Sequence, residues 1–169
     1  MPETMVRMGE LAASAVDGDV LVSLGLGSCI GLALVDRRVG VAGLAHIVLP
    51  DSGGSAPPNS FKFADCAVPE LVERVVAAGG RRPLLEAALV GGASMFAVSN
   101  AMLEVGVRNE AAVRDLLAAY KIPVIAAETG GDRGRTIRVH VGSHRVTVRE
   151  AGGVEIVLVP GIAPVAVAA

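Results

Sequence analysis

The strongest constraint on the fold is that the apolar stretches of this chain are short and repeatedly broken. The uncharged run over residues 20–35 contains Gly25, Gly27 and Gly31, and it is shorter than the roughly 20 residues that a membrane-spanning helix needs. Short apolar runs bounded by turn residues are typical of buried strands. The sequence therefore predicts a fold rich in short strands, with no insertion into a membrane.

The length of 169 residues predicts one compact domain over 1–169, because two cores would each be small at this size. Hydrophobic residues make up 52% of the chain but aromatic residues only 2%, so the core must be built from Val, Leu, Ile and Ala. The formal net charge of -2 provides no basic surface to attract the phosphate backbone, which argues against nucleic acid as a partner.

The first ten residues lack the apolar segment of a secretory signal, so a cytoplasmic, reducing location is expected. Cys29 and Cys66 are then expected to remain free thiols. Cys29, His46 and Cys66 also lack the paired spacing that usually marks a zinc site. No metal and no cofactor are expected.

Apolar periodicity predicts strands over 19–24, 84–90, 122–127 and 154–159, helices over 61–78 and 113–120, and a helical-looking segment over 95–103. Pro69 suggests that the regular part of the first helix starts near it, and Asn109 is the expected cap of the second. The polar segment 51–60 predicts a loop, and 160–169 predicts a docked or frayed tail.

Two pairs of apolar runs predict antiparallel hairpins. Runs 30–36 and 39–49 flank Arg37-Arg38, and runs 136–141 and 144–149 flank Gly142-Ser143. Strands outnumber helices, and hairpins alternate with helical connections. The predicted class is therefore mixed α+β rather than a doubly wound parallel sheet.

The first hairpin indicates a reactive pair. If it turns symmetrically about Arg37-Arg38, then Cys29 faces His46, and facing residues hold their Cβ atoms about 4.5–5.5 Å apart. An imidazole at that distance can take the thiol proton and leave a nucleophilic thiolate in an ion pair. Cys29 is the candidate nucleophile and His46 the candidate base.

The residues around this pair suit the same chemistry. The glycines before Cys29 remove side-chain bulk beside the sulfur, and the backbone N–H groups of Gly27, Ser28 and Cys29 are candidate donors to an oxyanion. The hydroxyl of Ser23 is expected to hold the second ring nitrogen of His46, which would complete a triad.

Each residue also has a purely structural interpretation. A lone cysteine beside glycines, or one histidine in an apolar strand, is more often a packed core residue than a catalytic one. Only the expected opposition of Cys29 and His46 raises the pair above that level. Cys66 is expected on the core face of a helix, while His140 and His144 are expected beside a turn at an exposed edge.

The segments SLGLGSC (23–29) and GLAHIVLPDS (43–52) resemble the CheD family of chemotaxis proteins. The likeness continues through Phe63-Ala64-Asp65, VPEL (68–71), GGASMF (91–96), GVRN (106–109) and GGDRGRT (130–136). In this resemblance the family's nucleophile falls on Cys29 and its histidine on His46. Its third residue, usually threonine, falls on Ser23, which keeps the hydroxyl but loses the β-branch.

The resemblance implies a three-layer α/β/β sandwich of mixed, largely antiparallel sheets, similar to cytotoxic necrotising toxin deamidases. It implies an enzyme that converts glutamine to glutamate on the cytoplasmic helices of chemoreceptors, without a cofactor. It also implies a CheC-type phosphatase as a protein partner.

Two alternatives remain open from the sequence. A non-catalytic adaptor would keep the fold and bind a CheC-type phosphatase or a receptor, although the intact Cys29, His46 and Ser23 argue against it. A methylesterase acting on glutamyl esters would use the same three residues. Only substrate assays separate the amide from the ester.

Overall fold

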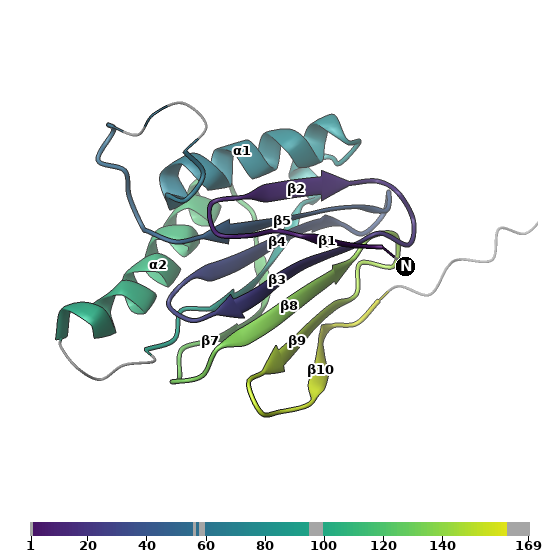
Figure 1. The fold of residues 1–169 in the computed structure, drawn as a ribbon. Coiled ribbons are helices and arrows are strands. Elements are labelled where there is room, and N and C mark those ends of the chain that lie inside the picture. The colour runs from purple at the N-terminus through teal and green to yellow at the C-terminus, as the bar shows by residue number, and fades with distance from the viewer. Residues whose placement is uncertain (1, 56, 58–59, 95–99, 162–169) are drawn as a thin grey trace, which may run out of the picture.

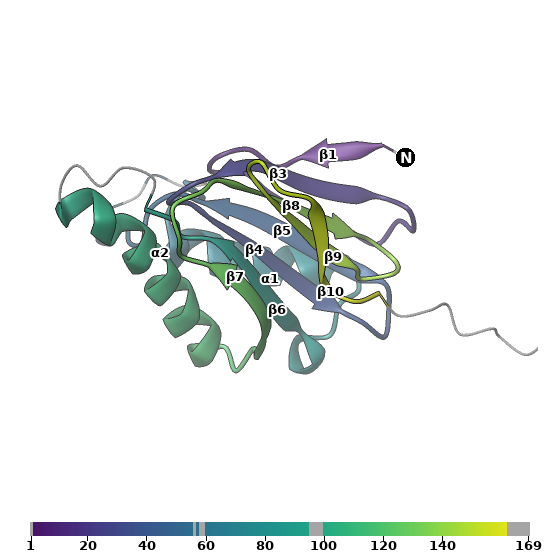
Figure 2. The same cartoon turned by 90° about the horizontal axis from the view of Figure 1, so that it is seen from below.

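The computed structural model describes residues 2–55, 57, 60–94 and 100–161. These residues form two five-stranded sheets, one stacked on the other, with the helices against the outer face of the second sheet (Figures 1 and 2). The first sheet has the order β1 (Glu3–Met5), β3 (Val20–Leu26), β8 (Arg135–His140), β9 (Val146–Glu150) and β10 (Glu155–Val159). The second has the order β2 (Leu11–Ser14), β5 (Val41–Ile47), β4 (Ile30–Asp36), β6 (Glu86–Gly91) and β7 (Val124–Thr129).

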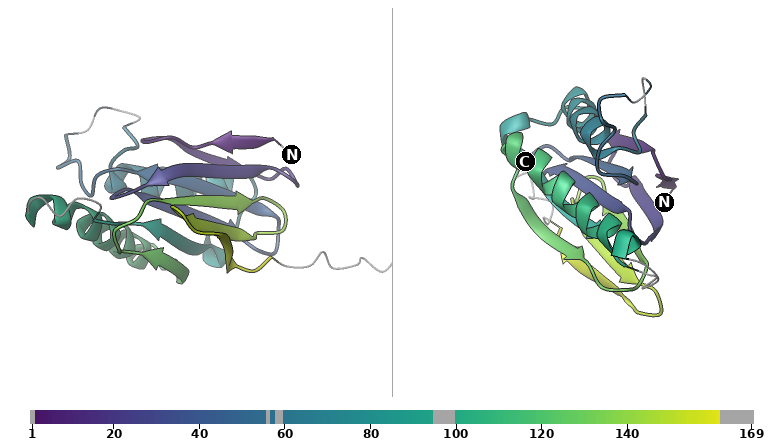
Figure 3. Two further views of the ribbon diagram at one scale, coloured as in Figure 1. Left: turned by 60° about the horizontal axis from the view of Figure 1, so that its bottom comes forward. Right: turned by 90° about the vertical axis from the view of Figure 1, so that its left-hand side faces the viewer.

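The helices are α1 (Ala64–Ala77) and α2 (Asn100–Ala119), with a short 3₁₀ turn η1 (Arg82–Leu84) between them. Within the sheets, only the pairs β1–β3 and β6–β7 are parallel in the described part of the chain. The predicted three-layer α+β architecture with largely antiparallel sheets is therefore confirmed, and Figure 3 shows the same layers from two further sides. Neither helix, as far as the structure describes them, is long and apolar enough to cross a membrane.

The second sheet is the middle layer, so its strands are buried on both faces. In β4, Ile30, Leu32 and Leu34 pack toward the helices, whereas Ala33 and Val35 pack toward the first sheet. Alternate residues point to opposite faces of a strand, so β4 needs apolar side chains throughout. This explains why the sequence around it carries no charge until Asp36.

The first hairpin forms, but its predicted register is wrong. Asp36 pairs with Val41 rather than Val39, because the turn comprises residues 37–40 and Gly40 adopts a φ of 70°. The Asp36 carboxylate also accepts a hydrogen bond from the Arg38 N–H within this turn. The register is displaced by two positions, an even number, so every side chain keeps its predicted face of the sheet.

The second hairpin has the predicted register, because Val139 pairs with Val146 about the Gly142-Ser143 centre. The expected exposed edge is wrong. β8 lies inside the first sheet between β3 and β9, and His144 is buried beside the turn with a φ of 60°.

The helices differ from their predicted starts. α1 begins at Ala64, so that Pro69 lies inside it, and the buried face that includes Ala64, Val68 and Leu71 packs on the second sheet. α2 continues through position 109, so Asn109 is not a cap. The first five residues of the predicted segment 95–103, and residues 162–169 of the predicted tail, lie outside the described residues.

Asp36 links the far end of this hairpin to the chain after α1. Burial by itself raises the pKa of Asp36, but hydrogen bonds from Arg81 and the Arg38 N–H outweigh it and lower that pKa. A lowered carboxyl pKa stabilises the fold above the pKa of the unfolded chain, and this contribution is lost as pH falls through the folded pKa.

We therefore expect the melting temperature to fall as the pH is lowered from about 5 to about 2, and Asp36→Asn to remove part of this fall. Thermal unfolding followed by circular dichroism across that range measures the effect. Glu70→Gln, which breaks the exposed ion pair with Arg74 on α1, is the control and should keep the wild-type slope. An Asp36→Asn slope equal to that of the wild type would contradict this role.

Candidate active site

Cys29 and His46 lie at the same end of the sandwich, at the left of Figure 1, where β3 turns into β4 and β5 ends. Cys29 directly precedes β4, is 8% exposed, and packs among the residues between the two sheets. His46 is 4% exposed and follows Ala42 and Leu44 on the face of β5 that also points between the sheets. The structure therefore places both side chains in the same layer.

The two residues are not directly opposed, which corrects the prediction. His46 pairs with Gly31, and Cys29 lies diagonally across the ladder, a relation that places such residues about 7–8 Å apart. The Nε2 atom of His46 has no hydrogen-bond partner among the described residues, so the thiol and the imidazole are near but not bonded. Catalytic hydrogen bonds are often long or poorly aligned before a substrate binds and tighten only in the complex, so the missing bond does not rule out the pair.

A main-chain carbonyl fixes the His46 ring. Nδ1 lies 3.2 Å from the Val6 carbonyl oxygen, which can only accept, so Nδ1 must carry the proton for this hydrogen bond to form. Nε2 is then the unprotonated nitrogen, free to accept a proton. This is the tautomer that a base for Cys29 requires.

Ser23 occupies the site differently from the prediction. Its hydroxyl is fully buried and donates to the Val6 carbonyl over 2.7 Å, so it does not bond directly to His46. Ser23 and His46 share that carbonyl as acceptor. The hydrogen bonds therefore link Ser23 to the histidine through the Val6 carbonyl.

The segment that carries Val6 was missed by sequence reasoning. The Gly9 N–H donates to the His46 carbonyl and the His46 N–H donates to the Glu10 carbonyl, both over 3.0 Å. The flanking strands β1 and β2 span only Glu3–Met5 and Leu11–Ser14, which is too short for a pattern of alternation to identify them. The segment also forms one wall of a depression of about 430 Å³ beside the base, lined by Met5, Val6, Arg7, Met8, Val22, Leu24 and His46.

The turn before Cys29 is held by its carbonyl groups. The Gly27 oxygen accepts from the Ala93 N–H over 2.8 Å, and the Cys29 oxygen accepts from the Gly92 N–H over 2.9 Å. Between them, the Ser28 oxygen accepts from Asn109 Nδ2 over 2.9 Å. Among the described residues, none accepts a hydrogen bond from the N–H groups of Gly27, Ser28 or Cys29 outside that turn.

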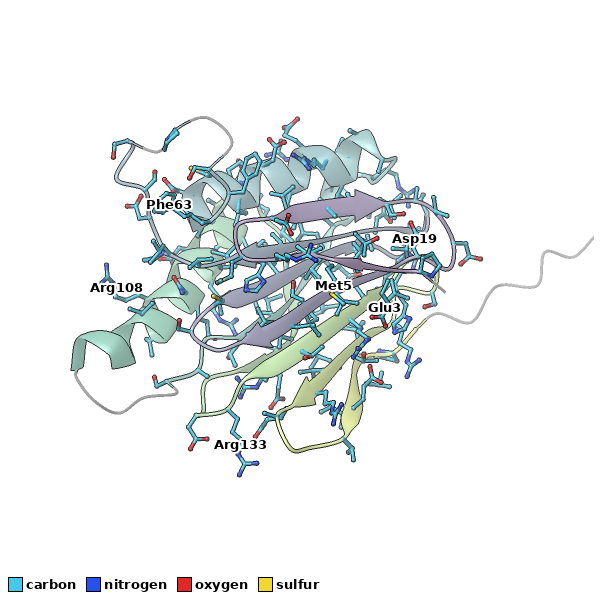
Figure 4. The ribbon with its side chains drawn as sticks, in the orientation of Figure 1. Glu3, Met5, Asp19, Phe63, Arg108 and Arg133 are labelled. Atoms are coloured by element: carbon cyan, nitrogen blue, oxygen red, sulfur yellow. The ribbon has the colours of Figure 1, made fainter. Side chains whose placement is uncertain are left out.

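Helix α2 supplies Asn109 from the other side of the second sheet. Figure 4 shows, through the labelled Phe63 and Arg108, that the segment before α1 and the middle of α2 reach this same end of the molecule. A Cβ on Gly106 would lie 2.7 Å from the carbonyl oxygens of Gly92 and Ala93. Glycine at that position lets the helix backbone approach the loop after β6.

Gly91 makes a second close approach. Its φ is 117°, a conformation that other residues rarely adopt, and a Cβ there would overlap the Cys29 carbonyl oxygen. We expect Gly91→Ala to lower the free energy of unfolding by about 3 kcal/mol, from backbone strain and overlap together.

Urea denaturation of Gly91→Ala and Gly53→Ala measures this cost. Gly53 has a positive φ of 67° but nothing within 4 Å of an added Cβ, so its variant reports backbone strain without overlap. It should lose only about 1 kcal/mol. Equal losses in the two variants would show that the contact with Cys29 is unimportant.

Burial favours the neutral form of both Cys29 and His46. It raises the pKa of the Cys29 thiol, and the residue's own backbone N–H opposes this only in part. Burial lowers the pKa of His46, against smaller opposing effects of the Val6 carbonyl and Glu10. Both shifts favour the neutral thiol and the neutral imidazole over the predicted ion pair.

The remaining sequence candidates lie elsewhere. Cys66 is on α1, a partly exposed position on the opposite side of the second sheet from Cys29, and both cysteines are free. Within the described ranges, no three His, Cys, Asp or Glu side chains gather closely enough to hold a metal ion.

Known proteins resemble this chain over most of its length. The family model described as CheD chemotactic sensory transduction matches residues 48–150. A relative from Clostridium novyi named "Probable chemoreceptor glutamine deamidase CheD" is 43% identical over 78% of this chain and 83% of its own. The "Chemoreceptor glutamine deamidase CheD" of Bacillus velezensis is 44% identical over 78% of this chain and 81% of its own.

A third relative, from Symbiobacterium thermophilum and also named a probable chemoreceptor glutamine deamidase, is 43% identical over 87% of this chain and 92% of its own. Among solved structures, the crystal structure of Neisseria meningitidis protein NMB0706 aligns with a TM-score of 0.45 and 10% identity. That alignment covers 78% of this chain and 63% of the other, and so slight a likeness indicates nothing about function.

Proposed function

The chain belongs to the CheD family, and from that premise we propose that it deamidates glutamine side chains on the cytoplasmic helices of chemoreceptors through Cys29 and His46. The names of its relatives identify the chain as an amidohydrolase. One observation carries the assignment of the residues. A free thiol and an imidazole with an unprotonated, unpartnered Nε2 lie in the same layer at one end of the described fold.

The reaction proceeds through a thioester. His46 Nε2 takes the proton of Cys29 as the sulfur attacks the carboxamide carbon of glutamine, and the same proton passes to the leaving nitrogen, which departs as ammonia. Water then attacks the thioester with His46 as base, which releases glutamate and restores the thiol. No cofactor enters any step.

The turn before Cys29 suits the charge that develops on the carboxamide oxygen. The N–H groups of Gly27, Ser28 and Cys29 are the proposed donors, since no described residue outside the turn uses them. Ser23 holds the Val6 carbonyl, which in turn orients His46. Its proposed role is therefore indirect, and serine supplies the same hydroxyl donor as the threonine usual in the family.

Two further proposals follow from the family alone. A CheC-type phosphatase is the proposed protein partner, and the cytotoxic necrotising toxin deamidases are the proposed structural relatives. A non-catalytic adaptor would not require the buried tautomer that Val6 imposes on His46.

The test uses a receptor cytoplasmic fragment that carries glutamine and a matched fragment that carries the glutamyl methyl ester. Mass spectrometry follows glutamate formation, and ammonia is assayed in parallel, with Cys29→Ala as the blank. We expect the wild type alone to release ammonia from the glutamine fragment. Hydrolysis of the ester without the amide would replace deamidation by esterase activity, and equal rates for wild type and Cys29→Ala would reject the proposed site.

A further inference from the structure

We infer that Asn109 is a positioning residue that aims the oxyanion-binding N–H groups beside Cys29, an inference that rests on the proposed function. Asn109 is fully buried on α2, and its Nδ2 donates to the carbonyl oxygens of Ser28 and Val48, each over 2.9 Å. Both partners can only accept, so the amide orientation is determined by them.

The planar peptide bond carries this contact to the reactive sulfur. In a trans peptide the C=O and the following N–H point in opposite directions. Because Asn109 holds the Ser28 carbonyl toward α2, the Cys29 N–H must point away from the helix. Ala93 holds the Gly27 carbonyl in the same way and so directs the Ser28 N–H.

The sulfur lies on the side to which the Cys29 N–H points. Cys29 packs in the layer between the sheets, opposite to α2, and its own N–H is close enough to the sulfur to oppose the effect of burial on the thiol pKa. An oxyanion forms one bond away from the carbon that the sulfur attacks. The N–H that Asn109 directs is therefore near the place where negative charge develops.

The Nδ2 atom of Asn109 also links the chain beside Cys29 to the chain beside His46. Ser28 directly precedes the nucleophile, and Val48 follows His46 by two positions at the end of β5. A single NH₂ group can donate to both carbonyls, whereas a hydroxyl has only one hydrogen. This explains why the position needs an amide rather than serine or threonine.

Asn109 also contributes to stability, because its two donors satisfy the carbonyl oxygens of Ser28 and Val48, which an apolar side chain would leave unpaired. Its own Oδ1 is buried and has no hydrogen-bond partner among the described residues, so the contacts of the amide are made by its donors. A catalytic role has to be separated from this structural one by experiment.

The test compares Asn109→Leu, which keeps the approximate size and removes both donors, with Thr147→Val. The second substitution removes a partly buried hydrogen bond, from the buried Thr147 to Glu155 in the first sheet. Two reactions of Cys29 are measured, glutamine deamidation and alkylation by iodoacetamide. Alkylation needs the sulfur but forms no oxyanion. We expect Asn109→Leu to lower kcat of deamidation by about 10- to 100-fold, with KM and the alkylation rate changing by less than about twofold.

The control Thr147→Val should leave both reactions near wild type. Asn109→Ser, which leaves at most one donor in a smaller side chain, serves as second variant should the leucine chain not fold. Equal falls in deamidation and alkylation would mean that Asn109 only supports the fold, and an unchanged kcat would also overturn the inference. Failure of the proposed function itself would look different, since Cys29→Ala would then deamidate as fast as the wild type.

Discussion

Cys29→Ala will lower the rate of glutamine deamidation by about 10⁴-fold or more, whereas Cys66→Ala will leave it within about twofold of wild type. Alanine removes the atom that attacks the carboxamide, and the chain has only one other thiol, that of Cys66. Cys66 is on α1, across the second sheet from this layer. Comparing the two variants therefore shows whether activity requires a thiol at position 29 or the loss of any thiol lowers it.

Ammonia release from a glutamine-bearing receptor fragment, measured over hours, resolves a change of this size. Circular dichroism melts should show that Cys29→Ala folds, because the substitution removes one sulfur from a nearly buried position. A loss of activity in Cys66→Ala as large as in Cys29→Ala would move the chemistry to the other face of the sheet.

His46→Ala will lower kcat/KM by about 10³-fold, because the thiol then has no base and the leaving nitrogen has no acid. The effect has a pH signature. Burial lowers the pKa of His46, so the wild type should keep its base form at pH values below those at which an ordinary histidine is protonated. Burial also raises the pKa of Cys29, so the thiol form persists to a higher pH than usual.

The profile of kcat/KM against pH for wild type and His46→Ala measures the pH range over which His46 acts as a base. The wild type should show a broad plateau whose acid limb falls below the usual histidine range, and the variant should lack that limb. An acid limb of the same position in both proteins would assign it to another group and leave His46 without a role as base.

The sequence predicted the layers of the fold better than the alignment of its strands. Strand and helix patterns depend on side-chain burial along one segment, and those patterns are strong in β4 and α1. The register of a hairpin depends on its turn. The prediction centred this turn on Arg37-Arg38, whereas in the structure it extends to Gly40, which has a positive φ. The predicted register was displaced by two positions, an even number, so Cys29 and His46 still lie on the same face of the sheet.

The sequence indicated the residues proposed to react, but not Val6 and Asn109, which hold them or their neighbours in place. Cys29 and His46 carry chemistry that can be recognised from residue type, and Ser23 was expected from its hydroxyl at the end of the preceding strand and again from the family resemblance. Val6 acts through a main-chain carbonyl, which no residue type reveals. Asn109 acts through contacts with Ser28 and Val48, residues far from it in the chain, so its local context indicated only a helix cap.

The central claim is that the Cys29 sulfur becomes covalently bound to the substrate while His46 moves the proton. Single-turnover reactions of wild-type enzyme with a glutamine-bearing receptor fragment, quenched in acid and analysed by intact mass and peptide mapping, test it directly. We expect a transient thioester on Cys29 that has lost ammonia and that does not form in Cys29→Ala. Ammonia release with no such adduct at any time point, or an adduct on Cys66, would contradict it.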